Sequence, residues 1–210
     1  MNKALIDKLR KDYPDVTIML ASKYLENKEA FLPFIEYGIT NFGENRDDAF
    51  ETKKAWLKDY DITWHFIGTM QTKKVKKVIN DIDVLHSLDR VKLAKEIEKR
   101  REGVLPCYIE VNISGEENKH GMRPEDVYDF VDTLKDFKHI RVIGLMGMAT
   151  HTDDEAIIRK QFQTLKNLRD AVQTTHPDVK GLSMGMTNDY HIALEEGSTL
   201  LRLGRILITE

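Results

Sequence analysis

The sequence has one cysteine, Cys107, in 210 residues, so it can form neither an internal disulfide nor a metal cluster held by several thiolates. It lacks any apolar run near the roughly 20 residues that a membrane-spanning helix needs. Its start, Met1–Pro14, is charged and indicates an amphipathic helix rather than a signal peptide. Neither charge predominates, because 32 basic and 35 acidic side chains give a net charge of -3. We therefore expect a cytoplasmic protein that binds neither nucleic acid nor membranes.

The chain also has no fixed-period repeat, low-complexity segment or linker rich in proline or glycine, so residues 1–210 are expected to form one domain. It does have short apolar runs separated by longer segments of helical period. The runs predict eight strands, over Thr17–Ser22, Thr40–Asn45, Thr63–Gly68, Val84–Leu88, Cys107–Asn112, Val142–Ala149, Leu182–Met186 and Leu200–Gly204. The clearest helices are expected over Asp153–Thr174 and Arg90–Arg101, with Asp153 and Asp89 as their N-caps.

This alternation of strands and helices indicates an α/β protein with a parallel sheet, because parallel neighbours need a crossover connection. Eight strands in a chain of this length favour a single closed (β/α)8 barrel of the TIM type over an open doubly wound sheet. The prediction depends most on the short strand at Thr40–Asn45, whose loss would favour the open sheet. In both folds the reactive groups gather at the carboxyl ends of the strands.

Lys23 follows the first predicted strand. Period-2 alternation places it on the same face as Met19 and Ala21, opposite Ile18 and Leu20. If Ile18 and Leu20 pack against helices, Lys23 points into the barrel mouth, where partial burial would favour an amine that forms Schiff bases. The alternative is a lysine that ends a strand at the solvated rim.

The last two predicted strands carry a second group of candidates. Arg202 shares a strand face with Gly204, and an arginine inside a barrel is costly to bury without an anion or an acceptor. Barrels often bind phosphate with backbone N–H groups after their seventh and eighth strands, where Ser183, Met184, Gly204 and Arg205 fall. Alternatively, the glycines only relieve crowding and Arg202 pairs with a carboxylate.

The sequence has three other notable polar features. His65, His86 and His151 fall in or just after strands, but no H-x-H or H-E-x-x-H spacing links them, so no metal site is expected. The run Lys73–Lys77 is interpreted as the solvated face of a helix, with binding of an anionic partner as the alternative. The polar loop Ile113–Met122 either covers the barrel mouth or is an exposed connection.

In order, the motifs ASK, NFGEN, WHFIG, LHSLDR, EVNIS, HGM, GLMGMA, LSMGM and LRLGR cover almost the whole chain. Together they resemble the pyridoxal phosphate homeostasis protein family, whose fold matches the N-terminal barrel of alanine racemase. The resemblance implies pyridoxal 5′-phosphate as the cofactor, held as a Schiff base on Lys23, with Asn45 lining the site. It also implies phosphate and ring contacts, made by Ser183, Met184, Gly204, Arg205 and, facing the pyridine nitrogen, Arg202.

An arginine opposite the pyridine nitrogen disfavours its protonation, so the ring is a weaker electron sink than one paired with an aspartate. The resemblance therefore implies a monomeric carrier that acts in vitamin B6 and amino-acid homeostasis, with apo forms of pyridoxal phosphate enzymes as candidate recipients. The alternative is a racemase-like enzyme, but alanine racemase takes a second acid/base from a further domain for which this chain has no room. A third interpretation is a barrel for a sugar phosphate, with Lys23 as a catalytic lysine.

The sequence departs from the family pattern at two loop positions and at its ends. Thr69 and Lys73 stand where the family usually has proline and asparagine after the third strand. The chain stops at Glu210, where relatives usually continue through Phe-Gly and a short tail, and its start is also short. These departures concern one loop and the seam that closes the barrel, whereas the cofactor positions keep the family residues.

Overall fold

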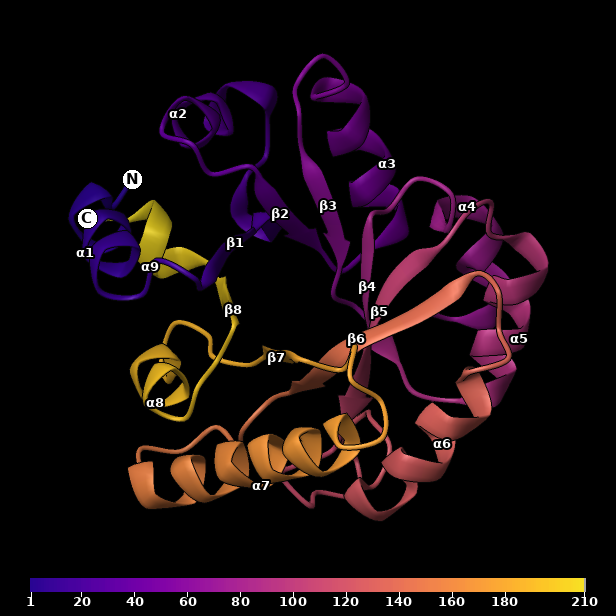
Figure 1. Cartoon of the computed structure of the whole chain (residues 1–210). Coiled ribbons are helices and arrows are strands. Elements are labelled where there is room, and N and C mark those ends of the chain that lie inside the picture. The colour runs from indigo at the N-terminus through magenta and orange to yellow at the C-terminus, as the bar shows by residue number, and fades with distance from the viewer. Residues whose placement is uncertain (210) are drawn as a thin grey trace.

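The computed structural model describes residues 1–209 and contains eight parallel strands in one closed barrel, with helices around the outside (Figure 1). The strands follow the order of the chain, and the last pairs with the first. They are β1 (Thr17–Ala21), β2 (Asn41–Glu44), β3 (Thr63–Phe66), β4 (Val84–Leu88), β5 (Leu105–Val111), β6 (Ile140–Gly147), β7 (Gly181–Ser183) and β8 (Leu200–Leu203). This confirms the predicted (β/α)8 barrel.

The strand on which the prediction depended most, β2, is fully part of the sheet, because it pairs with β3 along its whole length and with β1 at two positions. Several strands end earlier than the sequence predicts. β1 ends at Ala21, β2 at Glu44 and β7 at Ser183. Lys23 and Asn45 therefore belong to the loops at the barrel mouth, where they are not bound to the alternation of a strand.

The helices are α1 (Lys3–Asp12), α2 (Leu32–Glu36), α3 (Asp47–Trp56), α4 (Val75–Val78), α5 (Val91–Arg100), α6 (Val127–Leu134), α7 (Glu155–Gln173), α8 (Tyr190–Glu195) and α9 (Arg205–Ile208). Within residues 1–209, none of them has both the length and the apolar character needed to cross a membrane. Both predicted N-caps are wrong. The side chain of Asp154, not Asp153, accepts from the N–H of Ala156, since α7 begins one residue later than expected. Arg90 occupies the cap position of α5, and Asp89 instead forms an ion pair with it.

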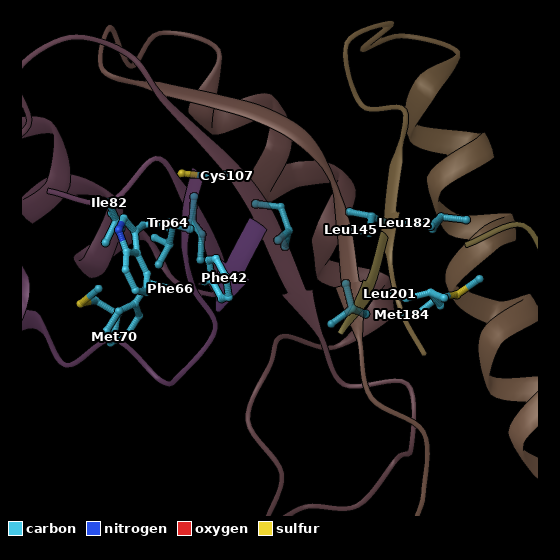
Figure 2. Close-up of a cluster of buried hydrophobic side chains, with 14 of the residues drawn as sticks. Phe42, Trp64, Phe66, Met70, Ile82, Cys107, Leu145, Leu182, Met184 and Leu201 are labelled. Carbon is cyan, nitrogen blue, oxygen red and sulfur yellow. The ribbon is translucent and has the colours of Figure 1, made fainter. Parts of the chain in front are cut away.

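The hydrophobic core lies between the barrel and its helices. Part of it surrounds Phe42 and Trp64 (Figure 2). The Trp64 ring lies 6.0 Å from the ring of Phe42 and 5.5 Å from that of Phe50 on α3, measured between centroids, and all three are buried. Burying a side chain of this size contributes about 1.5–3 kcal/mol. This packing fixes α3 against β2 and β3 and so positions the loops at their ends.

The seam that closes the barrel is continuous. β1 and β8 pair at four positions, with Thr17 opposite Leu200 at one end. Next to it the N–H of Asn2 donates to the carbonyl of Leu207 at 2.7 Å, and the two ends of the chain lie side by side (Figure 1). Glu210, the last residue singled out in the sequence, lies outside the described residues.

Candidate functional site

A cavity of about 410 Å³ opens at the carboxyl ends of the strands. Barrel proteins bind their ligands at this face. Five of the seven predicted site residues line it: Lys23, Asn45, Arg202, Gly204 and Arg205. Among the described residues in the lining, Lys23 is the single lysine. The structure thus brings together, at one cavity, residues from both ends of the sequence.

Lys23 reaches the cavity from a short turn rather than from the strand itself. β1 ends at Ala21, and Ser22–Tyr24 form one 3-10 turn that carries the lysine onto the rim. The turn interrupts the alternation on which the predicted direction depended. The side chain of Lys23 is exposed, so the expectation of a partly buried amine is wrong. Its ammonium lies 4.9 Å from the centroid of the Tyr24 ring, within the range of a cation–π contact.

Arg202 is the most deeply buried cation of the site, with 5% of its surface exposed. Its Nη2 donates to the carbonyl of Gly147 at 2.8 Å, and its Nη1 lies 3.2 Å from Sδ of Met146. No described residue accepts a hydrogen bond from its buried Nε, and no described carboxylate forms an ion pair with it. Burial lowers its pKa to about 10, against the opposing charges of Asp189 and Glu110, so it is cationic at neutral pH. A buried cation with a free N–H suits an acceptor or an anion in the cavity.

Gly204 separates β8 from α9 and lies under the ring of Tyr24. A Cβ added at Gly204 would stand 3.2 Å from Cε2 of that ring. The guanidinium of Arg205 lies 5.7 Å from the centroid of the same ring, so Tyr24 contacts both Arg205 and Lys23. Arg205 is exposed and its charge is open to solvent. Exposed cations suit a phosphate group because they neutralise its charge, and a glycine beside them leaves room for the phosphate to approach the backbone.

The other two predicted phosphate ligands, Ser183 and Met184, do not line this cavity. Ser183 is buried, and its Oγ lies 2.9 Å from Nδ1 of His86. The side chain of Met184 packs in the hydrophobic core between the barrel and its helices. Its backbone N–H donates to the carbonyl of Leu200 at 3.2 Å. Their part in phosphate binding stays a prediction, and it would require both groups to exchange their present partners.

Ser183 is one end of a hydrogen-bonded chain inside the barrel. Nδ1 of His86 faces Ser183, Nε2 of His86 faces Nδ1 of His65, and Nε2 of His65 faces Oδ1 of Asn41, each at 2.9 Å. Since the Asn41 oxygen accepts, each histidine carries its proton on Nε2 and Ser183 donates. Burial lowers the pKa of His65 to about 4, and burial with the charges of His65 and Arg202 lowers the pKa of His86. Both rings are neutral at pH 7, and their nitrogens are already engaged with each other and with their neighbours.

The polar loop Ile113–Met122 contacts the rim of the cavity. Oγ1 of Thr150 donates to Oε1 of Glu116 at 3.0 Å, and both Thr150 and His151 line the cavity. Gln161 on α7 also donates to Oγ1 of Thr150, at 2.9 Å. The loop therefore touches the rim through Glu116, but none of its residues lines the cavity, and a covering role stays a prediction.

The two loop positions that depart from the family pattern lie away from this cavity. Thr69 and Lys73 are exposed, and neither lines the cavity that contains Lys23. The run Lys73–Lys77 forms a 3-10 turn and the start of α4, with its valine buried, and two of its lysines pair with Asp47. This confirms the predicted solvated helix face.

Comparison with known proteins agrees with the barrel fold. The family model described as "Alanine racemase, N-terminal domain" matches residues 6–209. A pyridoxal phosphate homeostasis protein from Aquifex aeolicus is 39% identical over 186 residues, which are 87% of this chain and 82% of that protein. The chain belongs to this family. Another pyridoxal phosphate homeostasis protein, from Helicobacter pylori, is 37% identical over 200 residues, which are 93% of this chain and 88% of that protein.

The same barrel is found in solved structures. PipY of Synechococcus elongatus PCC7942, with pyridoxal phosphate bound, superposes with a TM-score of 0.87 at 26% identity and covers 97% of this chain and 98% of that one. PipY without the ligand gives a TM-score of 0.89 at 28% identity, with the same coverage. The architecture therefore extends over nearly the full length of both proteins.

The loop that follows β7 also contributes to the cavity, although the sequence did not lead us to expect this. Thr187 and Asn188 line the cavity, and Asp189 closes the loop, because its Oδ1 accepts from the N–H of Met186 at 2.6 Å. Burial raises the pKa of the Asp189 carboxyl. The predicted strand extended to Met186, which concealed the loop. The signal that indicates it is a hydroxyl, an amide and a carboxylate in succession shortly after a barrel strand.

Proposed function

We propose that this chain binds pyridoxal phosphate as a Schiff base on Lys23 and acts as a carrier in intracellular pyridoxal phosphate and amino-acid homeostasis. The observation that carries the proposal is the presence of Lys23, Arg202 and Arg205 in the lining of one cavity. An aldehyde, a pyridine nitrogen and a phosphate call for an amine, a hydrogen-bond donor and a cation, respectively. The ligand-bound structure of PipY, similar along 97% of this chain, supports the same ligand here.

The residues of the cavity fit this cofactor. The exposed amine of Lys23 is free to condense with the aldehyde, forming a C=N bond and releasing water into solvent. Arg205 and Gly204 are suited to the phosphate, because one supplies charge and the other leaves room beside the backbone. Arg202 has a buried Nε from which no described residue accepts, and it is suited to the ring nitrogen. Asn45 lines the same cavity and provides an amide for the remaining polar atoms.

The charge of Arg202 supports a carrier rather than an amino-acid racemase. Pyridoxal phosphate supplies a reversible link to amines and an electron-withdrawing ring when it is bound. A cation opposite the ring nitrogen keeps that nitrogen unprotonated, which weakens the ring as an electron sink. Such a site stores a reactive aldehyde with little turnover of amino acids. We expect a monomer that releases the cofactor to apo forms of pyridoxal phosphate enzymes.

An absorption titration tests the site. The wild-type protein should develop the visible band of a protein-bound Schiff base on addition of pyridoxal phosphate, and Lys23→Ala should not. Lys28→Ala is the matched control, because Lys28 lies in the neighbouring 3-10 turn, Lys28–Ala30, and does not line the cavity. A band of equal strength in Lys23→Ala would contradict the proposal.

Turnover separates the carrier from a racemase-like enzyme. A carrier should interconvert L- and D-alanine at a negligible rate and should reactivate an added apo-enzyme. Saturable racemisation that disappears in Lys23→Ala would establish the enzyme instead. Proton transfer by a positioned acid or base contributes typically 10²–10⁴-fold to such a reaction, so the two outcomes differ by a measurable margin.

A further inference from the structure

A buried ion pair lies beside the cavity, between β2 and α3. Nζ of Lys53 is 2.5 Å from Oε2 of Glu44, and the exposures of the two side chains are 8% and 1%. Among the ion pairs of residues 1–209, this is the one whose partners are both so deeply buried. Neither residue lines the cavity itself.

Both partners instead bind backbone groups next to residues that do. Nζ of Lys53 donates to the carbonyl of Ser22 at 2.8 Å, and Ser22 immediately precedes Lys23. Oε1 of Glu44 accepts from the N–H of Asn45 at 2.9 Å. Oγ of Ser22 lies 3.1 Å from Oε2 of Glu44, so the turn that carries Lys23 also contacts the Glu44 carboxylate directly. The pair thus connects the turn that carries Lys23 to the loop that begins at Asn45.

Stability alone does not account for a pair of this kind. Removing two charges from water costs free energy that their attraction often fails to recover, and apolar side chains of similar size are frequently as stable. An apolar pair at these two positions would lack the directed hydrogen bonds that Lys53 and Glu44 make to the backbone. Lys23 is exposed and belongs to a turn of three residues, in which the N–H of Leu25 donates to the Ser22 carbonyl at 2.9 Å. Lys53 provides that carbonyl with a second partner, anchored in a helix.

We propose that Glu44 and Lys53 are positioning residues for Lys23, which hold the lysine turn and the Asn45 loop in the arrangement that pyridoxal phosphate requires. This inference rests on the proposed function. Precise placement matters because a displacement of about 1 Å of a reacting group is able to slow a reaction on the order of 100-fold.

Two neighbouring lysines give a matched test. Lys53 and Lys54 both lie in α3 and both pair with a carboxylate, but the pair of Lys54 with Asp81 is exposed and neither of its members lines the cavity. Lys53→Met is expected to weaken pyridoxal phosphate binding on the order of 10- to 100-fold and to slow the appearance of the Schiff-base band. Lys54→Met should behave as the wild type. Equal binding by the two variants would overturn the inference.

A double variant keeps the test valid if Lys53→Met alone does not fold. Glu44→Gln/Lys53→Met removes both charges, so no unpaired charge is left buried. The amide oxygen at position 44 still accepts from Asn45, whereas nothing replaces the bond to the Ser22 carbonyl. Amide hydrogen exchange of the cofactor-free protein should therefore accelerate over Lys23–Leu25 and stay slow at Asn45. Wild-type exchange over Lys23–Leu25 would overturn the inference.

The two experiments also separate this inference from the proposed function. Wild-type protein that forms no adduct on Lys23 would overturn the proposed function, and with it the purpose assigned to the pair. A wild-type adduct together with unaltered binding in Lys53→Met would overturn the positioning inference alone.

Discussion

Arg202 on β8 lies directly opposite Met19 on β1, across the seam where the barrel closes. The cavity spans this seam, because Lys23 follows β1 and Arg205 follows β8. A ligand held by both residues would bridge the first and last strands. Binding of the ligand and closure of the barrel would then be coupled, and the melting temperature should rise with ligand concentration and continue to rise after the site is saturated.

Removal of the Arg202 charge should alter the chemistry of the bound cofactor without lowering the stability of the protein. Burial already disfavours its charge and lowers its pKa to about 10, so Arg202→Met is expected to keep or raise the melting temperature. Without the cation, the ring nitrogen of bound pyridoxal phosphate is free to protonate, and slow transamination of L-alanine should increase. Arg159→Met, which removes ion pairs with Glu195 and Glu196 outside the cavity lining, is the control. Unchanged transamination in Arg202→Met would contradict its assignment to the ring nitrogen.

Gly204→Ala tests the close packing of Tyr24 over the glycine. The new Cβ would stand 3.2 Å from Cε2 of Tyr24 and would push the exposed ring from its place on the rim. We expect binding of pyridoxal phosphate to weaken roughly 10-fold, with little change in the melting temperature. The double variant Tyr24→Ala/Gly204→Ala should bind as tightly as Tyr24→Ala. Additive losses in the double variant would show that the methyl group acts on the ligand and not through the ring.

Acid should weaken the barrel through its internal histidines. Burial gives His65 a pKa of about 4 in the folded state, against 6.5 for the free side chain. The unfolded chain therefore binds the proton first, and the folded state loses stability as the pH falls from about 6.5 to about 4, by roughly 3 kcal/mol for this residue.

His65→Gln isolates this effect. Glutamine retains an acceptor for His86 and a donor for Asn41 but does not titrate. Urea unfolding should therefore show a smaller loss of stability between pH 7 and pH 4.5 in this variant than in the wild type. An equal loss would assign the acid sensitivity to other groups.

Glu110 should act in the opposite direction. Burial, followed by the charge of Asp89, raises the pKa of its carboxyl to about 7 from 4.5. The folded state holds the proton more tightly, so this group's contribution to stability falls as the pH rises from about 4.5 to about 7. Glu110→Gln should be more stable than the wild type at pH 8, by roughly 3 kcal/mol, and similar to it at pH 4. A variant that is less stable at pH 8 would mean that the Glu110 carboxylate is needed for folding.

Hydrophobic periodicity was sufficient for the fold, because each strand of a parallel barrel is an apolar run and each helix has one apolar face. Val84–Leu88 is a strand with the predicted limits. The ends of the strands and helices were harder to predict. The predicted strand at Leu182–Met186 continues the apolar pattern through Met184, but Gly185 has a φ of 98° and turns the backbone out of the sheet.

Those parts of the site that depend on strand ends were accessible from the sequence, since the carboxyl ends of barrel strands converge. Arg202 could be placed on an inward face because residues alternate along a strand, with Leu201 and Leu203 on the other face. The Glu44–Lys53 pair could not, because it joins a strand to the helix after it, and only the packing of α3 brings the two side chains together. The contact between His86 and Ser183 spans 97 residues and likewise has no local signal.

The central claim is that one particular lysine holds the cofactor. The most direct test is borohydride reduction of the protein with pyridoxal phosphate, followed by peptide mapping of the reduced adduct. The account predicts a single stoichiometric adduct on Lys23, prevented by Lys23→Ala and retained in Lys28→Ala. An adduct on another lysine, or modification distributed over the surface lysines, would contradict it.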